Sequence, residues 1–255
     1  MRSFYKHSAL FFTLNLALLF GLSSAYAQHS DIWVVSDGGL VGASSTDVET
    51  GLPVRIDVTT GKFLFLITFG DGFGPFTVDD PGMQAEANAL TSDGVFNYRA
   101  VGTLWFWDGT DWSGSSTDNE TIVITDALGS MTTVSDTGIT NPEGAIDFVS
   151  DGSVHQHVDF LLDHATSAPA VGAYMIDLEF FITDSVGGTI LEDAAHAVRI
   201  AFNYQLPPSE FDAAVAALTA PAVDPVAVPI PVLFTFMLAC LFVLVYQRIA
   251  RPYVS

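Results

Sequence analysis

Two histidines and an aspartate alternate in this chain as His155-x-His157-x-Asp159. Residues two apart in a β-strand share a face, so a strand over 154–162 would project all three side chains together. Most of the other positions in this range are apolar, which is typical of a strand whose opposite face meets the core. Imidazole and carboxylate groups bind zinc and similar divalent ions. The spacing predicts a metal site, and the alternative is an exposed polar face.

Further carboxylates come from Asp177 and Glu179, which alternate with apolar residues in a strand expected over 173–183. If this strand and the one over 154–162 form a hairpin, a symmetric register brings His157 near Asp177 and His155 near Glu179. A slip of one residue would separate these groups. Near the N-terminus, His29 and Asp31 repeat the one-residue gap. The predicted zinc ligands are therefore His155, His157, Asp177, Glu179, His29 and Asp31.

Calcium is an alternative ion, because several turns rich in Asp and Gly offer oxygen ligands. None of them has the alternating acidic positions, central Gly and distal Glu of the twelve-residue calcium loop. Turn formation alone explains most of them. These segments are 71–72, 79–82, 108–111 and 118–120.

Aromatic residues gather in the segment 105–112, which contains Trp105, Phe106, Trp107 and Trp112. On an exposed face they could stack on sugar rings. Alternate members of a strand in a β-sandwich face the core, and we favour that interpretation.

Signs of catalysis are sparse in the chain. It has no G-x-S-x-G elbow, P-loop, H-E-x-x-H or G-x-G-x-x-G motif. The chain has a single cysteine, which excludes an internal disulfide and a multi-cysteine zinc site. This residue, Cys240, lies in an apolar segment. We therefore expect a protein that is not an enzyme, and a secreted hydrolase with an unrecognised carboxylate site is the least favoured hypothesis.

The middle of the chain consists of short runs rich in Val, Ile, Phe and Thr, separated by turn residues. This pattern predicts an all-β fold, an antiparallel β-sandwich or jelly roll, because no crossover helices are present for a parallel sheet. One short helix is expected from Ser209, as its N-cap, to about Leu218. The expected strands cover 32–36, 54–58, 63–69, 95–98, 103–107, 120–125, 130–135, 145–149, 154–162, 173–183 and 197–204.

Both ends of the chain have the features of targeting segments. Residues 1–27 combine a positive start, an apolar stretch and an Ala-x-Ala site, which predicts a cleaved signal peptide. Residues 226–246 carry no charge and are long enough for one transmembrane helix. Arg248 and Arg251 follow and favour a cytoplasmic C-terminus, which places the middle of the chain across the inner membrane, in the cell envelope or at the surface.

Charge supports this division of the chain. All 29 acidic residues lie between 28 and 225, where only four Lys or Arg residues occur, so this part has a net charge of −25. A nucleic-acid partner is excluded, because such binding rests on basic residues that neutralise phosphates. A strongly anionic domain attracts cations, and solubility is the simpler explanation of the same charge.

The C-terminal pattern of 228–231 (Val-Pro-Ile-Pro), an apolar helix and terminal arginines resembles the PEP-CTERM sorting signals that exosortases process, although Ile230 stands where that motif has Glu. The exported region resembles the Zur-repressed PEP-CTERM protein family. That resemblance implies expression under zinc scarcity and zinc handling at the cell envelope. The matching segments are 29–33, 77–82, 107–109, 155–157 and 169–174, with the strand that contains Asp177 and Glu179.

We expect four parts: a signal peptide (1–27), a secreted β-sandwich (28–206), a short helix and Ala/Pro linker (207–228), and a sorting or transmembrane tail (229–255). The expected partners are the secretion machinery, an exosortase-type enzyme and the membrane. The expected function is an exported, membrane-anchored or exosortase-sorted envelope protein that binds zinc. The alternative is a structural or adhesive surface protein that binds sugar or calcium and has no dedicated zinc site.

Overall fold

The computed structural model describes residues 31–219, except 48–49, 71–73, 114–118 and 166–167. The predicted signal peptide (1–27), His29 and the apolar segment 226–246 lie outside the described residues. Among the residues that are described, no helix is both long and apolar enough to cross a membrane. The predictions for the two ends of the chain therefore stay predictions.

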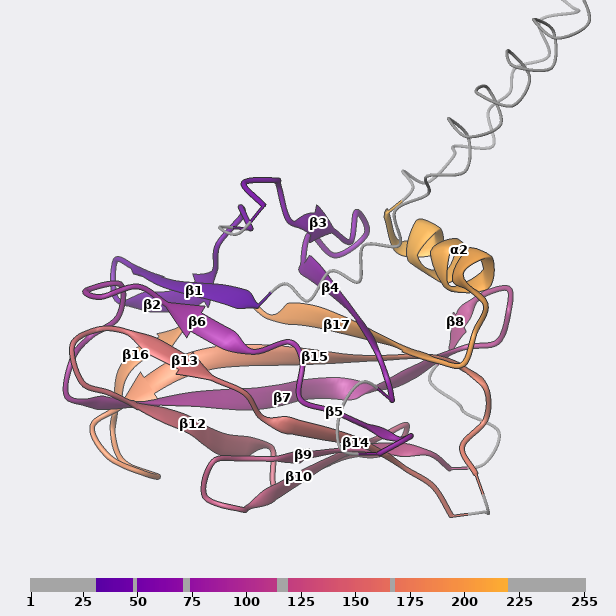
Figure 1. The fold of residues 1–255 in the computed structure, drawn as a ribbon. Helices are drawn as coiled ribbons and strands as arrows, with labels where there is room; N and C mark the ends of the chain where they lie inside the picture. Colours follow the sequence, from indigo (N-terminus) through magenta and orange to yellow (C-terminus); the bar gives the residue numbers. More distant parts are fainter. Residues whose placement is uncertain (1–30, 48–49, 71–73, 114–118, 166–167, 220–255) are drawn as a thin grey trace, which may run out of the picture. The chain divides into compact units, whose positions relative to one another are not determined.

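The described part of the chain is mostly β, with one short helix near its C-terminal end (Figure 1). A mixed sheet follows the order β13-β6-β1-β2-β16-β15-β17-β4-β3, and β7, β8 and β12 extend it from β15. A smaller antiparallel sheet has the order β11-β10-β9-β14-β5. The strands are β1 (Ile32–Asp37), β2 (Leu40–Ala43), β3 (Arg55–Ile56), β4 (Phe63–Thr68), β5 (Thr77–Val78), β6 (Met83–Ala85), β7 (Gly94–Trp107), β8 (Trp112–Ser113), β9 (Thr121–Thr125), β10 (Met131–Ser135), β11 (Gly138–Thr140), β12 (Glu143–Val149), β13 (Val154–Gln156), β14 (Asp159–Asp163), β15 (Gly172–Thr183), β16 (Ile190–Ala194) and β17 (Val198–Tyr204).

Both sheets contribute to one cluster of buried side chains. Ile122, Ile124 and Phe160 of the small sheet belong to the same cluster as Tyr98 and Phe180 of the large one. Figure 1 shows β9, β10 and β14 lying along β7 and β12. Burial of these apolar surfaces is the main stabilising term of the fold.

The prediction of purely antiparallel pairing is wrong for three strand pairs. β1 with β6, β16 with β2, and β17 with β4 are parallel. The sequence disfavours a parallel sheet because a parallel connection between consecutive strands needs a crossover helix. That requirement does not apply here, because each parallel pair joins strands that are far apart in the chain and are connected through other strands.

The prediction of one strand over 154–162 is also wrong. β13 ends at Gln156 and pairs with β6 in the large sheet, whereas β14 begins at Asp159 and pairs with β9 and β5 in the small one. The predicted hairpin with the strand that contains Asp177 does not form, since β15 pairs with β7, β16 and β17. Alternation of polar and apolar residues continues across the break, so the sequence pattern gave no sign of the change of sheet.

The predicted C-terminal helix is confirmed as α2 (Pro208–Thr219). Its first turn begins one residue before the predicted cap, and the Pro207 carbonyl accepts from the Glu210 and Phe211 amides. A proline at the first helical position has a backbone angle that already suits a helix, which explains the earlier start. Most of the aromatic segment is core, as favoured above: Phe106 and Trp107 are buried, and Trp107 packs with Trp112 against α2.

The helix is fastened by a hydrogen bond from the indole Nε1 of Trp112 to the Ala214 carbonyl, at 3.0 Å. Trp112→Phe removes this donor, and we expect the free energy of unfolding to fall by about 1 kcal/mol. Chemical denaturation measures the change. Trp105→Phe is the matched control, because the Trp105 side chain is exposed and its indole makes no hydrogen bond with a described residue. Equal losses in the two variants would contradict the role of this bond.

Candidate metal centre

The site is built where three strands of the large sheet lie side by side. β1 runs parallel to β6 with Ile32 opposite Met83, and β13 runs antiparallel to β6 with Gln156 opposite Met83. One residue further along, the same register places Asp31 and His157 on either side of Gly82. The Ile32 amide donates to the Gly82 carbonyl at 2.8 Å, which fixes this row. Figure 1 shows β1, β6 and β13 as neighbours.

Gly82 leaves the space in which the two side chains meet. A Cβ atom at this position would lie 2.7 Å from Asp31 Oδ1 and 2.7 Å from His157 Nε2. Strands are about 4.8 Å apart, so side chains in alternate strands are normally separated by the side chain between them. The missing side chain therefore lets a carboxylate and an imidazole from β1 and β13 approach each other directly.

His155 completes the cluster, because it lies two residues before His157 and shares its face. Its Nε2 is 3.4 Å from Asp31 Oδ2, and the two imidazole centroids are 5.6 Å apart. One ligand atom from each of Asp31, His155 and His157 lies within 4.8 Å of the others. Two atoms bound at about 2.0 Å to one tetrahedral zinc ion are about 3.3 Å apart, so the His155–Asp31 pair already has this spacing.

The tautomer of His157 is set by a hydrogen bond at its Nδ1 atom. Nδ1 lies 2.8 Å from the Asp79 carbonyl oxygen, which can only accept, so Nδ1 carries the proton of the neutral ring. Asp80 Oδ1 lies 3.5 Å from the same nitrogen. Nε2 is left with a free lone pair on the side of Asp31. Metal-binding histidines usually have such a carbonyl or carboxylate partner on the other nitrogen.

The cluster is open to solvent on the histidine side. The side chains of His155 and His157 are 60% and 37% exposed, whereas Asp31 is 12% exposed. Three protein ligands with one side open leave a coordination position for water or for another donor. The geometry suits an ion that is bound from solution and exchanges with it.

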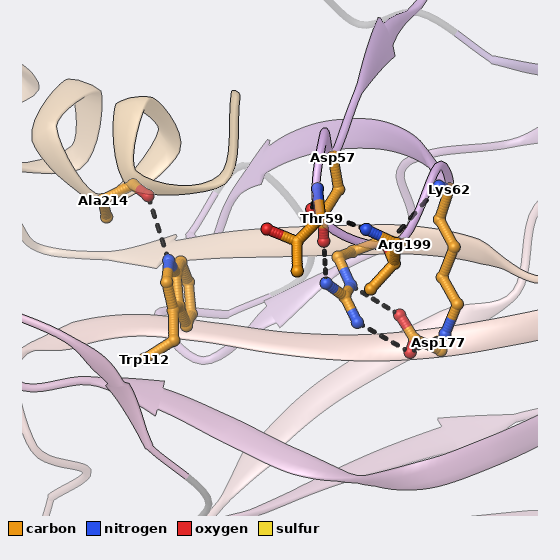
Figure 2. A network of polar contacts seen from close by, with 8 residues as sticks. Asp57, Thr59, Lys62, Trp112, Asp177, Arg199 and Ala214 are labelled. Carbon is orange, nitrogen blue, oxygen red and sulfur yellow. Dashed lines mark hydrogen bonds and ion pairs between the residues drawn. The ribbon is translucent and has the colours of Figure 1, made fainter. Parts of the chain in front are cut away.

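Asp177 lies in β15, which does not pair with β1, β6 or β13, and Figure 2 shows it beside Arg199 and Lys62. It is directly opposite Arg199 and accepts from Arg199 Nε at 2.8 Å and Nη2 at 3.0 Å. Lys62 Nζ donates to Asp177 at 2.6 Å, and Arg199 Nη1 also contacts Asp57. Burial lowers the pKa of Arg199, but the hydrogen bonds and charges of Asp177 and Asp57 outweigh it and raise this pKa. The prediction of Asp177 as a ligand beside His157 is not supported, because both carboxylate oxygens hold arginine.

Glu179 is not near the histidines either. It is opposite Arg99 and accepts from Arg99 Nη1 at 3.3 Å. Its predicted place depended on the hairpin that does not form. Asp159 begins β14 in the small sheet and pairs with Thr125. His29 lies outside the described residues, so its role as a ligand stays a prediction.

The turns considered for calcium have structural roles where they are described. The Asp108 carboxylate accepts from the amides of Asp111 and Thr110, and these hydrogen bonds lower its pKa. Glu120 is buried and accepts from the Ala170 amide. The turn at 79–82 instead supports the histidine cluster. Residues 71–73 and 118 lie outside the described residues.

Of the acids predicted as ligands, Asp31 lies beside the histidines, whereas Asp177 and Glu179 do not, and the sequence does not predict the contribution of Gly82. In the sequence, the segment Asp79-Asp80-Pro81-Gly82 is recognisable only as a turn and as part of a family resemblance. The sequence signal that exists is the combination of an acidic turn with Gly directly before β6. Nothing in the sequence shows that this turn lies between β1 and β13.

No protein-family model matches the chain, and no curated protein matches it in sequence.

Proposed function

We propose that this protein binds a divalent metal ion, zinc before others, through Asp31, His155 and His157. The observation that carries the proposal is the convergence of these three side chains across β1 and β13 over Gly82. Two imidazoles with one carboxylate form a ligand set that zinc accepts readily. His29, two residues before Asp31, is the further donor that we assign from the sequence.

Charge supports cation binding. The region 28–225 has a net charge of −25, which raises the local concentration of cations around it. Several buried carboxylates of the described residues hold other parts of the protein, and this use favours a binding protein over a hydrolase. Asp126 accepts from three backbone amides, and Asp57 and Asp177 hold Arg199. We therefore propose a binding protein and not an enzyme.

The sequence supports a location outside the inner membrane. Residues 1–27 would direct export, and residues 226–246 would anchor the chain or present it to an exosortase-type enzyme. The proposal includes membership of the Zur-repressed PEP-CTERM family, which rests on the sequence resemblance. It also includes a sandwich or jelly-roll arrangement, which is supported by the core that the two sheets share. Protease treatment of spheroplasts, in which the outer side of the inner membrane is accessible, tests the location: cleavage of the domain is expected, and full protection would contradict export.

Zinc titration tests the metal site. The purified protein is freed of metal with a chelator and titrated with zinc sulfate by isothermal titration calorimetry, with metal analysis after gel filtration. We expect about one zinc ion per chain, which is the capacity of one three-ligand cluster. His155→Ala/His157→Ala should remove this binding and leave the fold intact, because both histidines are exposed.

The matched control is His164→Ala/His196→Ala, which removes two histidines elsewhere. It should bind zinc like the unmodified protein. Equal zinc binding by the unmodified protein and both double variants would contradict the assignment of the zinc site to Asp31, His155 and His157. Absence of zinc together with calcium binding that survives His155→Ala/His157→Ala would instead support the structural or adhesive alternative.

A further inference from the structure

A groove of about 370 Å³ lies on the outer face of β12, β7 and β15 and shares no lining residue with the metal centre. In its floor, Glu143 is opposite Arg99 and Phe181 is opposite Asn97 in the next row. Glu179 lies on the other side of Arg99, outside the lining of the groove. The residues between them in the chain, such as Tyr98 and Phe180, face the core. The groove has the size of a small-molecule site.

The walls of the groove are held by hydrogen bonds. On one side, the β9–β10 turn is joined to β12, because Asp126 accepts from the Ala145 amide and the Ala127 amide donates to the Ala145 carbonyl. On the other side, the β15–β16 loop is closed by the Asp184 amide, which donates to the Thr189 carbonyl. A groove with fixed walls loses little conformational entropy when a ligand binds.

The floor offers both donors and acceptors. Asn97 Nδ2 donates to the Val95 carbonyl and to Thr183 Oγ1, which orients the amide and leaves Oδ1 to accept from a ligand. Arg99 donates from Nε to the Glu143 carboxylate, at 2.8 Å, and from Nη1 to the Glu179 carboxylate. With the residues that the structure describes, Nη2 of Arg99 makes no hydrogen bond or ion pair. Mixed planar donors and acceptors suit a ligand with several hydroxyl groups.

Charge narrows the class of ligand. Glu143, Glu179 and Asp193 surround the Arg99 guanidinium, at 2.8, 3.3 and 4.0 Å, so an anion would meet an excess of negative charge. A metal ion is also disfavoured, because Arg99 occupies the place between the carboxylates. The guanidinium lies 4.7 Å from the Phe181 ring centroid, which holds it in position. A neutral polar ligand fits these charges best.

A β-bulge adds an aromatic ring to the same face. The register of β12 against β7 shifts between Ala145 and Asp147, so Phe148 comes opposite Val95, which is itself opposite Thr183 of the groove. Without the extra residue, Phe148 would face the other way, because side chains alternate along a strand. Phe148 is 63% exposed, so its ring is free for a ligand. Exposed aromatic rings offer a flat apolar surface to the C–H face of a sugar.

We propose that this groove, together with the exposed Phe148 on the same face outside its lining, binds a neutral oligosaccharide or polysaccharide, with Phe148 stacking on a sugar ring and Asn97, Arg99 and Glu143 bonding to hydroxyl groups. This site is independent of the metal centre in residues and in ligand. It is also different from the aromatic segment 105–112, most of which is buried against the core and α2.

Affinity electrophoresis of the full chain tests the proposal. Native gels contain hydroxyethylcellulose, galactomannan, dextran or the anionic alginate as probes. We expect slower migration in at least one neutral gel and none in alginate. Phe148→Ala should weaken this binding about tenfold, and Glu143→Ala should also weaken it, while thermal unfolding shows both variants folded.

Two controls separate the outcomes. Leu52→Ala removes a similarly exposed apolar side chain elsewhere, and His155→Ala/His157→Ala removes the metal centre; both should keep the binding. Loss of binding only in the histidine variant would tie the sugar to the metal site and overturn the groove. Migration unchanged by every neutral probe, retardation by alginate alone, or full binding by Phe148→Ala would overturn it as well.

Discussion

Arg199→Met is expected to lower the free energy of unfolding by about 3–5 kcal/mol, because two buried carboxylates then lose their cation. Arg199 is buried together with Asp57 and Asp177, which it joins through three of its nitrogens (Figure 2). Among the described residues, Lys62 is the cation that remains to compensate Asp177, and Asp57 keeps the backbone amides of its turn. Denaturant unfolding measures the loss.

Arg55→Met is the matched control, because Arg55 is exposed in β3 and no ion pair with another described residue involves it. Its unfolding free energy should stay within about 0.5 kcal/mol of the unmodified protein. A double variant, Asp177→Asn/Arg199→Met, should lose less than the sum of its single changes, since the two residues share one interaction. Equal stability of Arg199→Met and Arg55→Met would show that the network does not hold β15, β17 and the β3–β4 turn together.

Gly82→Ala is expected to weaken zinc binding about 10–100-fold while the protein stays folded, as is typical when groups that support metal ligands are disturbed. The new Cβ would lie 2.7 Å from Asp31 Oδ1 and from His157 Nε2, so it would push the two ligands apart. Both atoms are at the ends of side chains that can rotate, and the Gly82 backbone is not in the left-handed region. The unfolding free energy should therefore change by less than about 1 kcal/mol. Zinc calorimetry and thermal unfolding on the same sample separate the two effects.

The control for this variant is Gly42→Ala, whose Cβ would lie 2.8 Å from the His196 imidazole. It introduces the same methyl group against a histidine outside the metal centre, and it should leave zinc binding unchanged. If a folded Gly82→Ala protein binds zinc as tightly as the original, then Asp31 and His157 do not ligate one ion across Gly82.

The sequence predicted the β-rich class and the C-terminal helix, because both follow from local patterns of apolar and polar residues. It also placed His155 and His157 on one face, since that relation depends only on their spacing and the local extended chain. Asp31 was among the predicted ligands, but for its spacing from His29 and not for its true neighbours. The division of the chain by charge and polarity, with export as its consequence, stays a prediction.

What the sequence could not determine was strand pairing. The sequence-based hairpin assigned Asp177 and Glu179 to the histidines, whereas the structure assigns these acids to Arg199 and Arg99. Alternation decides which face a residue occupies but not which strand lies beside it, and the break at 157–158 leaves the alternation intact.

The chain alone thus determined which side chains are able to bind a metal and which faces they occupy, because these properties are local. The tertiary structure decided which of them meet. The contacts that join β1 and β13 to β6 pair Ile32 with Met83 and Gln156 with Met83, so they link residues far apart in the chain, and this pairing depends on packing across the whole sheet. Gly82 matters for metal binding only in that arrangement, because its missing side chain brings ligands together only when Asp31 and His157 lie on either side of it.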